Sequence, residues 1–252
     1  VFADVHDPGS KVVGLTIGYN VFAWTIDNGP CPNAITSDTM TVILYSDSTS
    51  APDAGPDVET CLPLTFAQLQ AVTPQLPATG TWSLIGGAGT IVDPTDPTTL
   101  VTDLQVGIST FVWTLDLSPC ANSGVLTDTM TVSVFDPAAP PADAGPDIEL
   151  CTPTTNTVMA ANTPLFPATG TWSLISGAGT IADTTDPATA ISGLAIGENV
   201  FVWEIYNGDC GLGPNITYDT VSVIVYDATA PAADAGTDQQ LCTPTTSTGL
   251  EG

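Results

Sequence analysis

The feature that most constrains the fold of this chain is that it repeats itself. The heptapeptide Thr-Gly-Thr-Trp-Ser-Leu-Ile occurs at 79–85 and again at 169–175, and the motif Asp-Ala-Gly-Pro-Asp at 53–57 recurs at 143–147. Both motifs return after 90 residues, and an altered copy of the second one, Asp-Ala-Gly-Thr-Asp, stands at 234–238. A fixed period of this size indicates an array of small modules, so function is expected to belong to the array.

The period also fixes the size of one module. About 90 residues suffice for a small β-sandwich but not for a Rossmann or barrel domain. Aligning the copies divides the chain into the C-terminal part of one module at 1–50, complete modules at 51–139 and 140–229, and the N-terminal part of a further module at 230–252. We interpret the chain as a segment of a longer protein, because it has no initiator Met or signal peptide. No run of about 18 apolar residues is present, so we expect no membrane insertion of this segment.

Alternating polarity predicts an all-β fold. Phe111, Trp113 and Leu115 share one face of their segment, and the residues between them share the other, which is typical of a half-buried strand. Seven short strands are predicted in the first complete module, at 58–61, 66–71, 80–85, 89–93, 98–104, 110–116 and 127–135. This spacing favours tandem Ig-like seven-stranded β-sandwich modules. Tryptophans of the third and sixth strands are expected in the core rather than on a carbohydrate-binding platform.

Charge and histidine content exclude two classes of function. The chain has 27 acidic residues and one basic residue, Lys11, which gives a formal net charge of -26 and excludes nucleic-acid binding. The single histidine, His6, lies in a partial module and has no counterpart in the others. A repeated Ser-His-Asp or Cys-His site is therefore impossible, and we expect no enzyme and no catalytic residues.

The six cysteines follow the repeat. Cys61 precedes Cys120 by 59 residues, and Cys151 precedes Cys210 by the same number, which predicts one disulfide within each complete module and an oxidising compartment. Cys31 and Cys242 are then unpaired in this segment. A rival scheme pairs Cys31 with Cys61, Cys120 with Cys151 and Cys210 with Cys242. We disfavour that scheme because it would span a whole final strand of ~12 residues, roughly 40 Å.

Acidic residues recur where one module meets the next. The pairs are Asp53 and Asp57, Asp143 and Asp147, and Asp234 and Asp238; each pair begins 8 residues after the last aromatic residue of the preceding strand. Such a joint of constant length could hold Ca²⁺, which prefers oxygen ligands. The alternative is that each Asp closes an Asx-turn or accepts bonds from backbone N–H groups. No other cofactor is expected.

The order of these motifs resembles a known group of proteins. Asp-Ala-Gly-x-Asp, Cys, Gly-Thr-Trp, Leu-x-x-Gly, Phe-x-Trp, Cys and Asp-Thr-Met-Thr-Val follow one another as in tandem Ig-like or PKD-like repeats of giant cell-surface adhesins of Bacteroidota, including adhesins linked to gliding motility. The resemblance covers essentially all 252 residues. It implies export to the cell surface by the type IX route and a role as a stalk or filament in attachment or gliding.

The same resemblance suggests sites of modification. The steps Asp38-Thr39-Met40, Asp128-Thr129-Met130 and Asp219-Thr220-Val221 resemble the short O-glycosylation acceptor of Bacteroidota. The strand register predicts that Thr39, Thr129 and Thr220 face outward, so that a glycan could be attached. An ordinary strand opening with a polar outer face explains the same residues.

Three functions remain open on the sequence alone. The leading hypothesis is a structural repeat segment of an extracellular stalk or filament, whose partners are neighbouring modules or copies of the same protein. The second is a module that binds surface glycans through exposed loops. The third is a filament subunit assembled by strand complementation between copies. It is disfavoured because the two partial modules together would lack the Gly-Thr-Trp strand.

Overall fold

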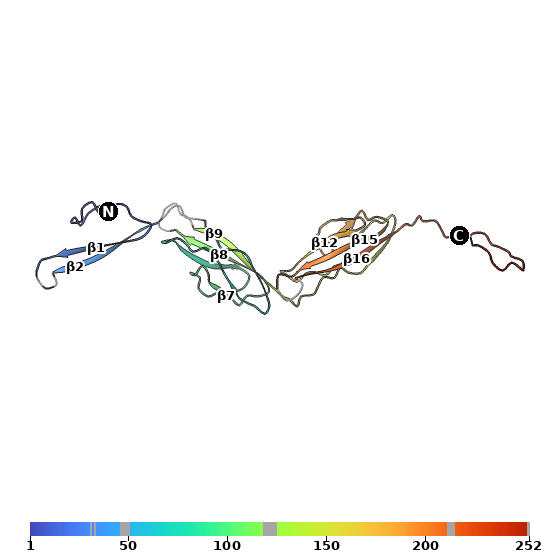
Figure 1. The fold of residues 1–252 in the computed structure, drawn as a ribbon, viewed down its shortest axis with the longest axis horizontal. Coiled ribbons are helices and arrows are strands. Elements are labelled where there is room, and N and C mark those ends of the chain that lie inside the picture. The colour runs from blue at the N-terminus through green and yellow to red at the C-terminus, as the bar shows by residue number, and fades with distance from the viewer. Residues whose placement is uncertain (31, 33, 46–50, 118–124, 211–214, 251–252) are drawn as a thin grey trace. The chain divides into compact units, whose positions relative to one another are not determined.

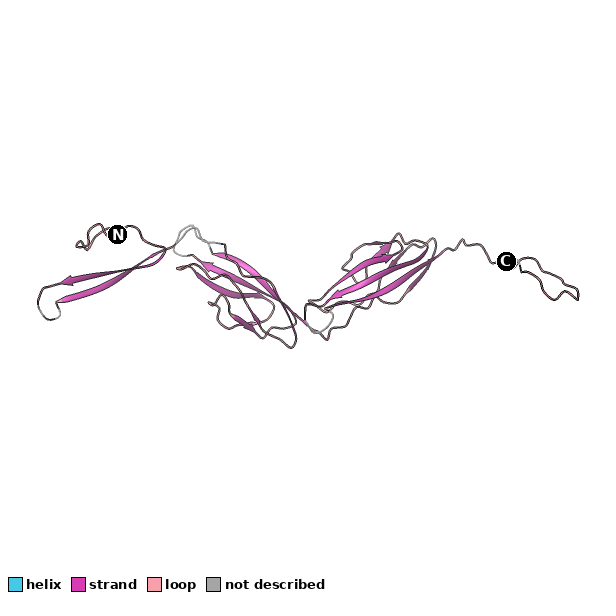
Figure 2. Cartoon of the chain, viewed as in Figure 1, coloured by secondary structure: helices cyan, strands magenta, loops and turns pink. Residues whose placement is uncertain are grey.

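The computed structural model describes all residues except 31, 33, 46–50, 118–124, 211–214 and 251–252. Every regular element of the described residues is a β-strand, which confirms the all-β expectation (Figure 2). None of the described segments forms a helix with the length and hydropathy needed to cross a membrane. The chain separates into two compact units, the first made of Val1–Ala139, Leu165–Ala168 and Tyr206–Asn215, and the second of Pro140–Pro164, Thr169–Ile205 and Ile216–Gly252.

The first unit contains a complete sandwich, part of which is labelled in Figure 1. Its strands are β3 (Val58–Cys61), β4 (Ala67–Gln68), β5 (Thr79–Gly86), β6 (Thr90–Ile91), β7 (Leu100–Thr102), β8 (Gly107–Asp116) and β9 (Leu126–Phe135). One sheet has the order β3-β9-β8-β5 and the other the order β4-β7-β6. Each expected strand is therefore present, although the short ones contain only two or three residues.

The two sheets of the first sandwich enclose a core of alternating side chains. Phe111, Trp113 and Leu115 are buried on one face of β8, as the period of two predicted. They pack with Leu69, which follows β4, and with Val101 of β7 in one hydrophobic cluster. The rings of Trp82 and Trp113 lie 5.0 Å apart, so the tryptophans belong to the core.

The second unit repeats this architecture. Its strands are β10 (Ile148–Cys151), β11 (Asn156–Val158), β12 (Thr169–Ser176), β13 (Thr180–Ile181), β14 (Ala190–Ser192), β15 (Gly197–Tyr206) and β16 (Ile216–Tyr226), and the sheets have the orders β10-β16-β15-β12 and β11-β14-β13. Trp172 and Trp203 are buried with ring centroids 5.1 Å apart. Equivalent sequence motifs thus produce equivalent packing.

The two ends of the chain carry less structure. Strands β1 (Gly18–Asp27) and β2 (Ile35–Leu44) form an antiparallel hairpin, and the described residues after Tyr226 contain no strand. Trp24 on β1 aligns in sequence with Trp113, yet it is 39% exposed whereas Trp113 is 0% exposed. Trp24 is more exposed than Trp113 because, among the described residues, no second sheet covers this face of the hairpin.

The first strand of each complete sandwich runs parallel to the last strand. β3 runs parallel to β9, with Cys61 opposite Phe135 at the end of β9. β10 runs parallel to β16 in the same way, with Cys151 opposite Tyr226. Because β8 and β9 are antiparallel and Gly107 pairs with Val134, Cys61 lies at the end of the sheet where β8 begins.

Candidate functional site

The acidic residues at the start of the first sandwich anchor the chain to β9. Asp57 accepts a hydrogen bond through Oδ1 from the backbone N–H of Thr131 at 2.7 Å, and Asp128 accepts one through Oδ2 from the N–H of Ala54 at 2.8 Å. Asp53 closes a turn by accepting the N–H of Gly55 at 2.9 Å. These carboxylates therefore fasten the segment before β3 to the strand beside it.

The second sandwich uses the same bonds. Asp147 accepts the N–H of Ser222 at 2.8 Å, and Asp219 accepts that of Ala144 at 2.9 Å. Asp143 accepts a hydrogen bond from the N–H of Gly145 at 2.9 Å. Asp234 makes the same turn by accepting the N–H of Gly236, also at 2.9 Å. Asp238 is exposed. The geometry thus matches the reading in which the acids satisfy backbone N–H groups.

Calcium at these joints stays a prediction. Among the described residues there is no group of three or more His, Cys, Asp or Glu side chains that could hold a metal ion. The sequence argument also missed the function of Asp128 and Asp219, which were assigned only to a glycan acceptor motif. Their bonds join residues 74 and 75 positions apart, and only their recurrence in every module could have indicated a structural role.

The three candidate glycan acceptors lie where the register placed them. Thr39, Thr129 and Thr220 are exposed on their strands. Thr129 pairs with Val112 on β8, directly before the buried Met130. A side chain at these positions can be modified without entering the core, so glycosylation remains sterically possible.

The structure contradicts the predicted disulfide pairing. Cys61 is bonded to Cys210, with a Cα–Cα distance of 5.5 Å and a sequence separation of 149 residues, so the pairs Cys61–Cys120 and Cys151–Cys210 are wrong. Cys151 and Cys242 are free and exposed. The rival scheme is wrong as well, because it joined Cys61 to Cys31 and Cys210 to Cys242. Cys31 and Cys120 lie outside the described residues.

The position of Cys61 within β3 explains the error. The predicted pairing requires both cysteines of a module to lie at the end of the sheet where the sixth strand ends. Cys61 is the last residue of β3 and lies beside the end of β9 and the start of β8. Residue 120 follows the other end of β8, which is ten residues long, or roughly 33 Å at 3.3 Å per residue. Cys61 is bonded to Cys210 and therefore cannot also bond Cys120, which lies outside the described residues.

The segment Tyr206–Asn215, between β15 and β16, belongs to the first unit. It contains Cys210, the disulfide partner of Cys61. The hydroxyl of Tyr206 donates to Glu59 Oε2 at 2.6 Å, and the N–H of Asp209 donates to the same oxygen at 3.2 Å. The side chain of Asn207 donates to the backbone oxygen of Asp136 at 2.9 Å. We call this segment, Tyr206 to Cys210, the docked loop.

Close packing accompanies these polar bonds. The ring of Phe135 meets that of Tyr206 edge-on, with centroids 6.1 Å apart. Gly208 has a φ of 72°, and a Cβ there would lie 2.5 Å from Cγ of Phe135. Glycine is therefore required at this position both by the backbone conformation and by the ring. The hydrogen bond to Glu59, followed by burial and the Glu59 charge, raises the pKa of Tyr206 to about 12.

The equivalent end of the second sandwich keeps the glutamate and the cysteine, has Tyr226 in place of Phe135, and carries no docked loop among the described residues. Glu149 and Cys151 stand on β10, and the hydroxyl of Tyr226 donates to Glu149 Oε1 at 3.2 Å. The charge of Glu149 and this hydrogen bond raise the pKa of Tyr226. Tyr226 is 49% exposed and Asp227 is exposed.

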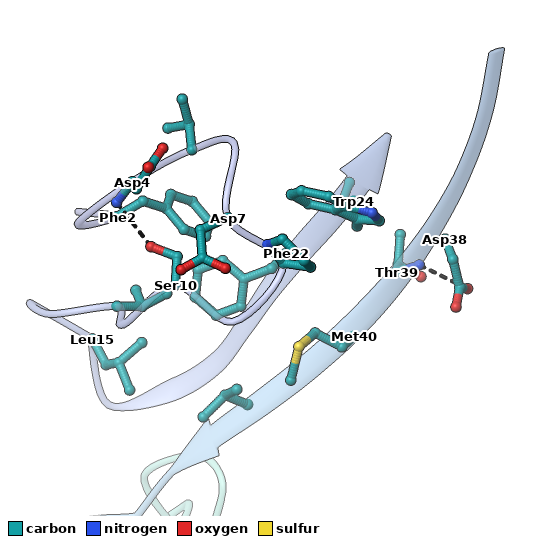
Figure 3. Close-up of a pocket in the computed structure, with 15 residues that line it drawn as sticks. Phe2, Asp4, Asp7, Ser10, Leu15, Phe22, Trp24, Asp38, Thr39 and Met40 are labelled. Carbon is teal, nitrogen blue, oxygen red and sulfur yellow. Dashed lines mark hydrogen bonds between the residues drawn. The ribbon is translucent and has the colours of Figure 1, made fainter. Parts of the chain in front are cut away.

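An apolar pocket of about 700 Å³ lies over the β1–β2 hairpin (Figure 3). Phe22, Trp24 and Met40 line its floor, and the ring of Phe2 packs edge-on against Phe22 at 5.4 Å. The floor residues align with Phe111, Trp113 and Met130, which are buried core residues of the first sandwich. The pocket is therefore the inner face of a sandwich sheet, which accounts for its apolar lining without a ligand.

Comparison with known proteins returned matches to solved structures alone. No family model matches the chain, and no curated protein matches its sequence. The PKD domain from KIAA 1837 protein is 23% identical, with 37% of this chain and 92% of that chain covered and a TM-score of 0.30. The PKD domain from human KIAA0319 is 21% identical over 38% of this chain and 88% of that chain, with a TM-score of 0.30. The human desmocollin-1 ectodomain is 13% identical, with 82% of this chain and 48% of that chain covered and a TM-score of 0.29. At these identities and scores a functional proposal must rest on the residues of the chain itself.

Proposed function

We propose that this chain is a structural repeat segment of an extended extracellular stalk or filament of a surface adhesin, acting in attachment or gliding. The observation that carries the proposal is the Cys61–Cys210 disulfide, because it joins a strand of one repeat to a loop of the next. A spacer transmits force along its length, so a covalent bond between successive repeats adds directly to its function. The bonds of Glu59 to Tyr206 and Asp209 support the same joint.

Composition supports an extracellular setting. Disulfides form and persist in oxidising compartments, and a disulfide between repeats is typical of secreted proteins. The net charge of -26 makes copies of the segment repel one another, which keeps an array soluble and extended. Export by the type IX route belongs to the proposal through the resemblance of the motifs to adhesin repeats.

Force spectroscopy on the whole chain tests the mechanical role. The disulfide closes a separation of 149 residues, which corresponds to a contour length of roughly 500 Å at about 3.4 Å per residue. When the unfolded chain is pulled from its two ends, the oxidised form is expected to extend less than the reduced form by this length. The Cys61→Ser variant is expected to reach the full extension without reductant. Equal extension of the oxidised and reduced chains would contradict a joint that transmits force.

A glycan array distinguishes a spacer from a binding module. The intact chain is expected to show no saturable binding, because the proposal gives it a connecting role. Saturable binding to a defined glycan, abolished by substitution in an exposed loop, would assign the segment to the glycan-binding class instead.

A further inference from the structure

We propose that the docked loop binds the first sandwich before any covalent bond forms, and that this recognition selects Cys210 as the disulfide partner of Cys61. The surface that recognises the loop is the end of the sheet that carries Glu59, Phe135 and Asp136, which we call the receptor end. The inference rests on the proposed function and deepens it, because it says how the joint between successive repeats is directed to one cysteine.

The polar contacts between the docked loop and the receptor end involve no sulfur atom. Glu59 Oε2 accepts the hydroxyl of Tyr206 at 2.6 Å and the N–H of Asp209 at 3.2 Å. The side chain of Asn207 donates to the backbone oxygen of Asp136 at 2.9 Å. Two of these hydrogen bonds have a carboxylate as acceptor, which makes them stronger than bonds between neutral groups. All three can form while both cysteines are reduced.

Phe135 is the apolar part of the receptor end. Its side chain is 3% exposed, yet it does not belong to the hydrophobic cluster around Trp82 and Trp113. The docked loop covers it instead, because the ring of Tyr206 meets it edge-on and Gly208 is buried beside it. Burial of an aromatic ring favours association without any covalent bond. The loop therefore has both a polar and an apolar reason to bind.

Gly208 couples the fit on the Phe135 ring to the position of the cysteine. The N–H of Cys210 donates to the oxygen of Gly208 at 3.2 Å, which fixes the cysteine relative to the glycine. A Cβ at Gly208 would lie 2.5 Å from Cγ of Phe135, so a side chain there would push the loop away from the ring. The Cα atoms of Cys61 and Cys210 are 5.5 Å apart, and a disulfide does not form beyond about 7 Å. A modest displacement of the loop is thus enough to prevent the bond.

Spacing along the chain does not select Cys210. The chain has six cysteines, and the partner that Cys61 bonds is 149 residues away. Closing a long loop costs more entropy than closing a short one, so chance encounter would favour nearer cysteines. A docked loop holds its thiol beside Cys61 and raises the effective concentration of that thiol. Recognition of the loop therefore supplies the selectivity that spacing lacks.

The covalent step is a thiol–disulfide exchange with a small disulfide such as oxidised glutathione. The thiolate of Cys210, which is less buried than Cys61, attacks one sulfur and releases one glutathione thiolate. The Cys61 thiolate then attacks the sulfur of Cys210 and displaces the second glutathione. Two protein thiols are oxidised to one disulfide, and one oxidised glutathione is reduced to two thiols, so atoms and electrons balance.

The first test equilibrates the full chain in buffers of reduced and oxidised glutathione. Mass spectrometry after digestion at aspartate residues measures the glutathione ratio at which half of Cys61 is bonded to Cys210. Gly208→Ala should lower the equilibrium constant for this disulfide about tenfold, the factor that corresponds to ~1.4 kcal/mol of lost docking. Cys210 should then accumulate as the mixed disulfide with glutathione.

Gly193 supplies the matched control. It has the same φ of 72° as Gly208, but a Cβ there would meet no described heavy atom within 4 Å. Gly193→Ala therefore carries the same backbone strain without a contact to the receptor end, and it should leave the oxidation equilibrium unchanged. In a Phe135→Ala background, where the ring is absent, Gly208→Ala should cost less than it does in the wild-type chain.

The second test examines docking without the disulfide. In the Cys210→Ser chain, the N–H of Asp209 should still exchange with solvent hydrogen slowly, because its acceptor Glu59 lies on β3. Adding Gly208→Ala to that chain should speed the exchange about tenfold. Far-UV circular dichroism and tryptophan fluorescence of each variant check that both sandwiches are folded.

Two outcomes would overturn the inference. One is an equal oxidation equilibrium for Gly208→Ala and Gly193→Ala, and the other is exchange of Asp209 in the Cys210→Ser chain at the rate of an unstructured amide. In both cases the wild-type disulfide could still shorten the extension of the oxidised chain in force spectroscopy, which would leave the stalk proposal standing. Failure of the stalk proposal would appear instead as equal extension of oxidised and reduced chains.

Discussion

The glycine of the Gly-Thr-Trp motif allows the buried tryptophan of β8 to pack against β5. A Cβ at Gly80 would lie 2.5 Å from Cη2 and 2.7 Å from Cε2 of Trp113, whereas carbon atoms in contact lie about 3.5–4.0 Å apart. Cζ2 of the ring would lie closer still, so the ring would have to move by at least about 1.5 Å. Trp113 is 0% exposed and packs against Trp82, so it has no space into which to move. Gly80→Ala is therefore expected to destabilise the first sandwich by about 1–3 kcal/mol through overpacking.

The same strand offers a matched control. A Cβ at Gly86 would come no closer than 3.9 Å to Thr110, and neither Gly80 nor Gly86 has a positive φ. Gly86→Ala therefore removes only the conformational freedom of the unfolded chain and should be neutral or stabilise by up to about 1 kcal/mol. The two variants carry the same chemical change on one strand, and the expected difference between them is about 1–4 kcal/mol.

Urea unfolding followed by tryptophan fluorescence measures this difference. Trp82 and Trp113 report the first sandwich, and Trp172 and Trp203 report the second. Gly80→Ala should lower the midpoint of one transition and leave the other in place. In the second sandwich, a Cβ at residue 170 would approach Trp203 as closely, so Gly170→Ala should lower the other midpoint. If Gly80→Ala and Gly86→Ala unfold at the same midpoint, the proposed packing of the ring on the glycine is refuted.

Three further predictions concern the polar groups. The pKa of Tyr206 is raised in the folded state, so the stability supplied by the Tyr206–Glu59 bond is fully present below pH 10 and is lost as pH rises through about 12. The difference in urea midpoint between wild type and Tyr206→Phe should therefore disappear over this range. A difference that stays constant to pH 12 would contradict a stabilising role for this bond. Asp57→Ala should destabilise by about 1 kcal/mol because it leaves the N–H of Thr131 without its acceptor; a saturable rise of the wild-type melting temperature on adding Ca²⁺ would instead favour a metal at the joint. Mass spectrometry of the native protein should find a glycan on Thr129, and a native mass equal to that of the unmodified sequence would exclude it.

Strand positions and core residues could be predicted because they depend on local pattern. The alternation of Phe111, Trp113 and Leu115 reports directly which face of β8 is buried. The repeat strengthened the argument, since the same alternation recurs in each copy. Trp24 shows where the pattern stops being sufficient: it has the core register, but whether it is covered depends on strands elsewhere in the chain.

The cysteine pairing could not be predicted because it depends on the end of the sheet at which each cysteine lies. A spacing of 59 residues between Cys61 and Cys120 is compatible with either direction of the first strand. Parallel pairing of β3 with β9 decides the outcome, and it is set by bonds such as that from Thr131 to Asp57 across 74 residues. No local pattern encodes a contact of that range.

Strand direction also connects two motifs that the sequence presents as independent. The carboxylates of Asp57 and Asp128 hold the segment before β3 against β9, and this fixes β3 parallel to its neighbour. Parallel pairing brings Cys61 beside Phe135, the residue against which the docked loop packs. The hydrogen bonds of Asp57 and Asp128 thus place Cys61 next to the docked loop of the next repeat. A joint of constant length is needed because a shift of β3 by one residue would turn the Cys61 side chain to the opposite face of the sheet.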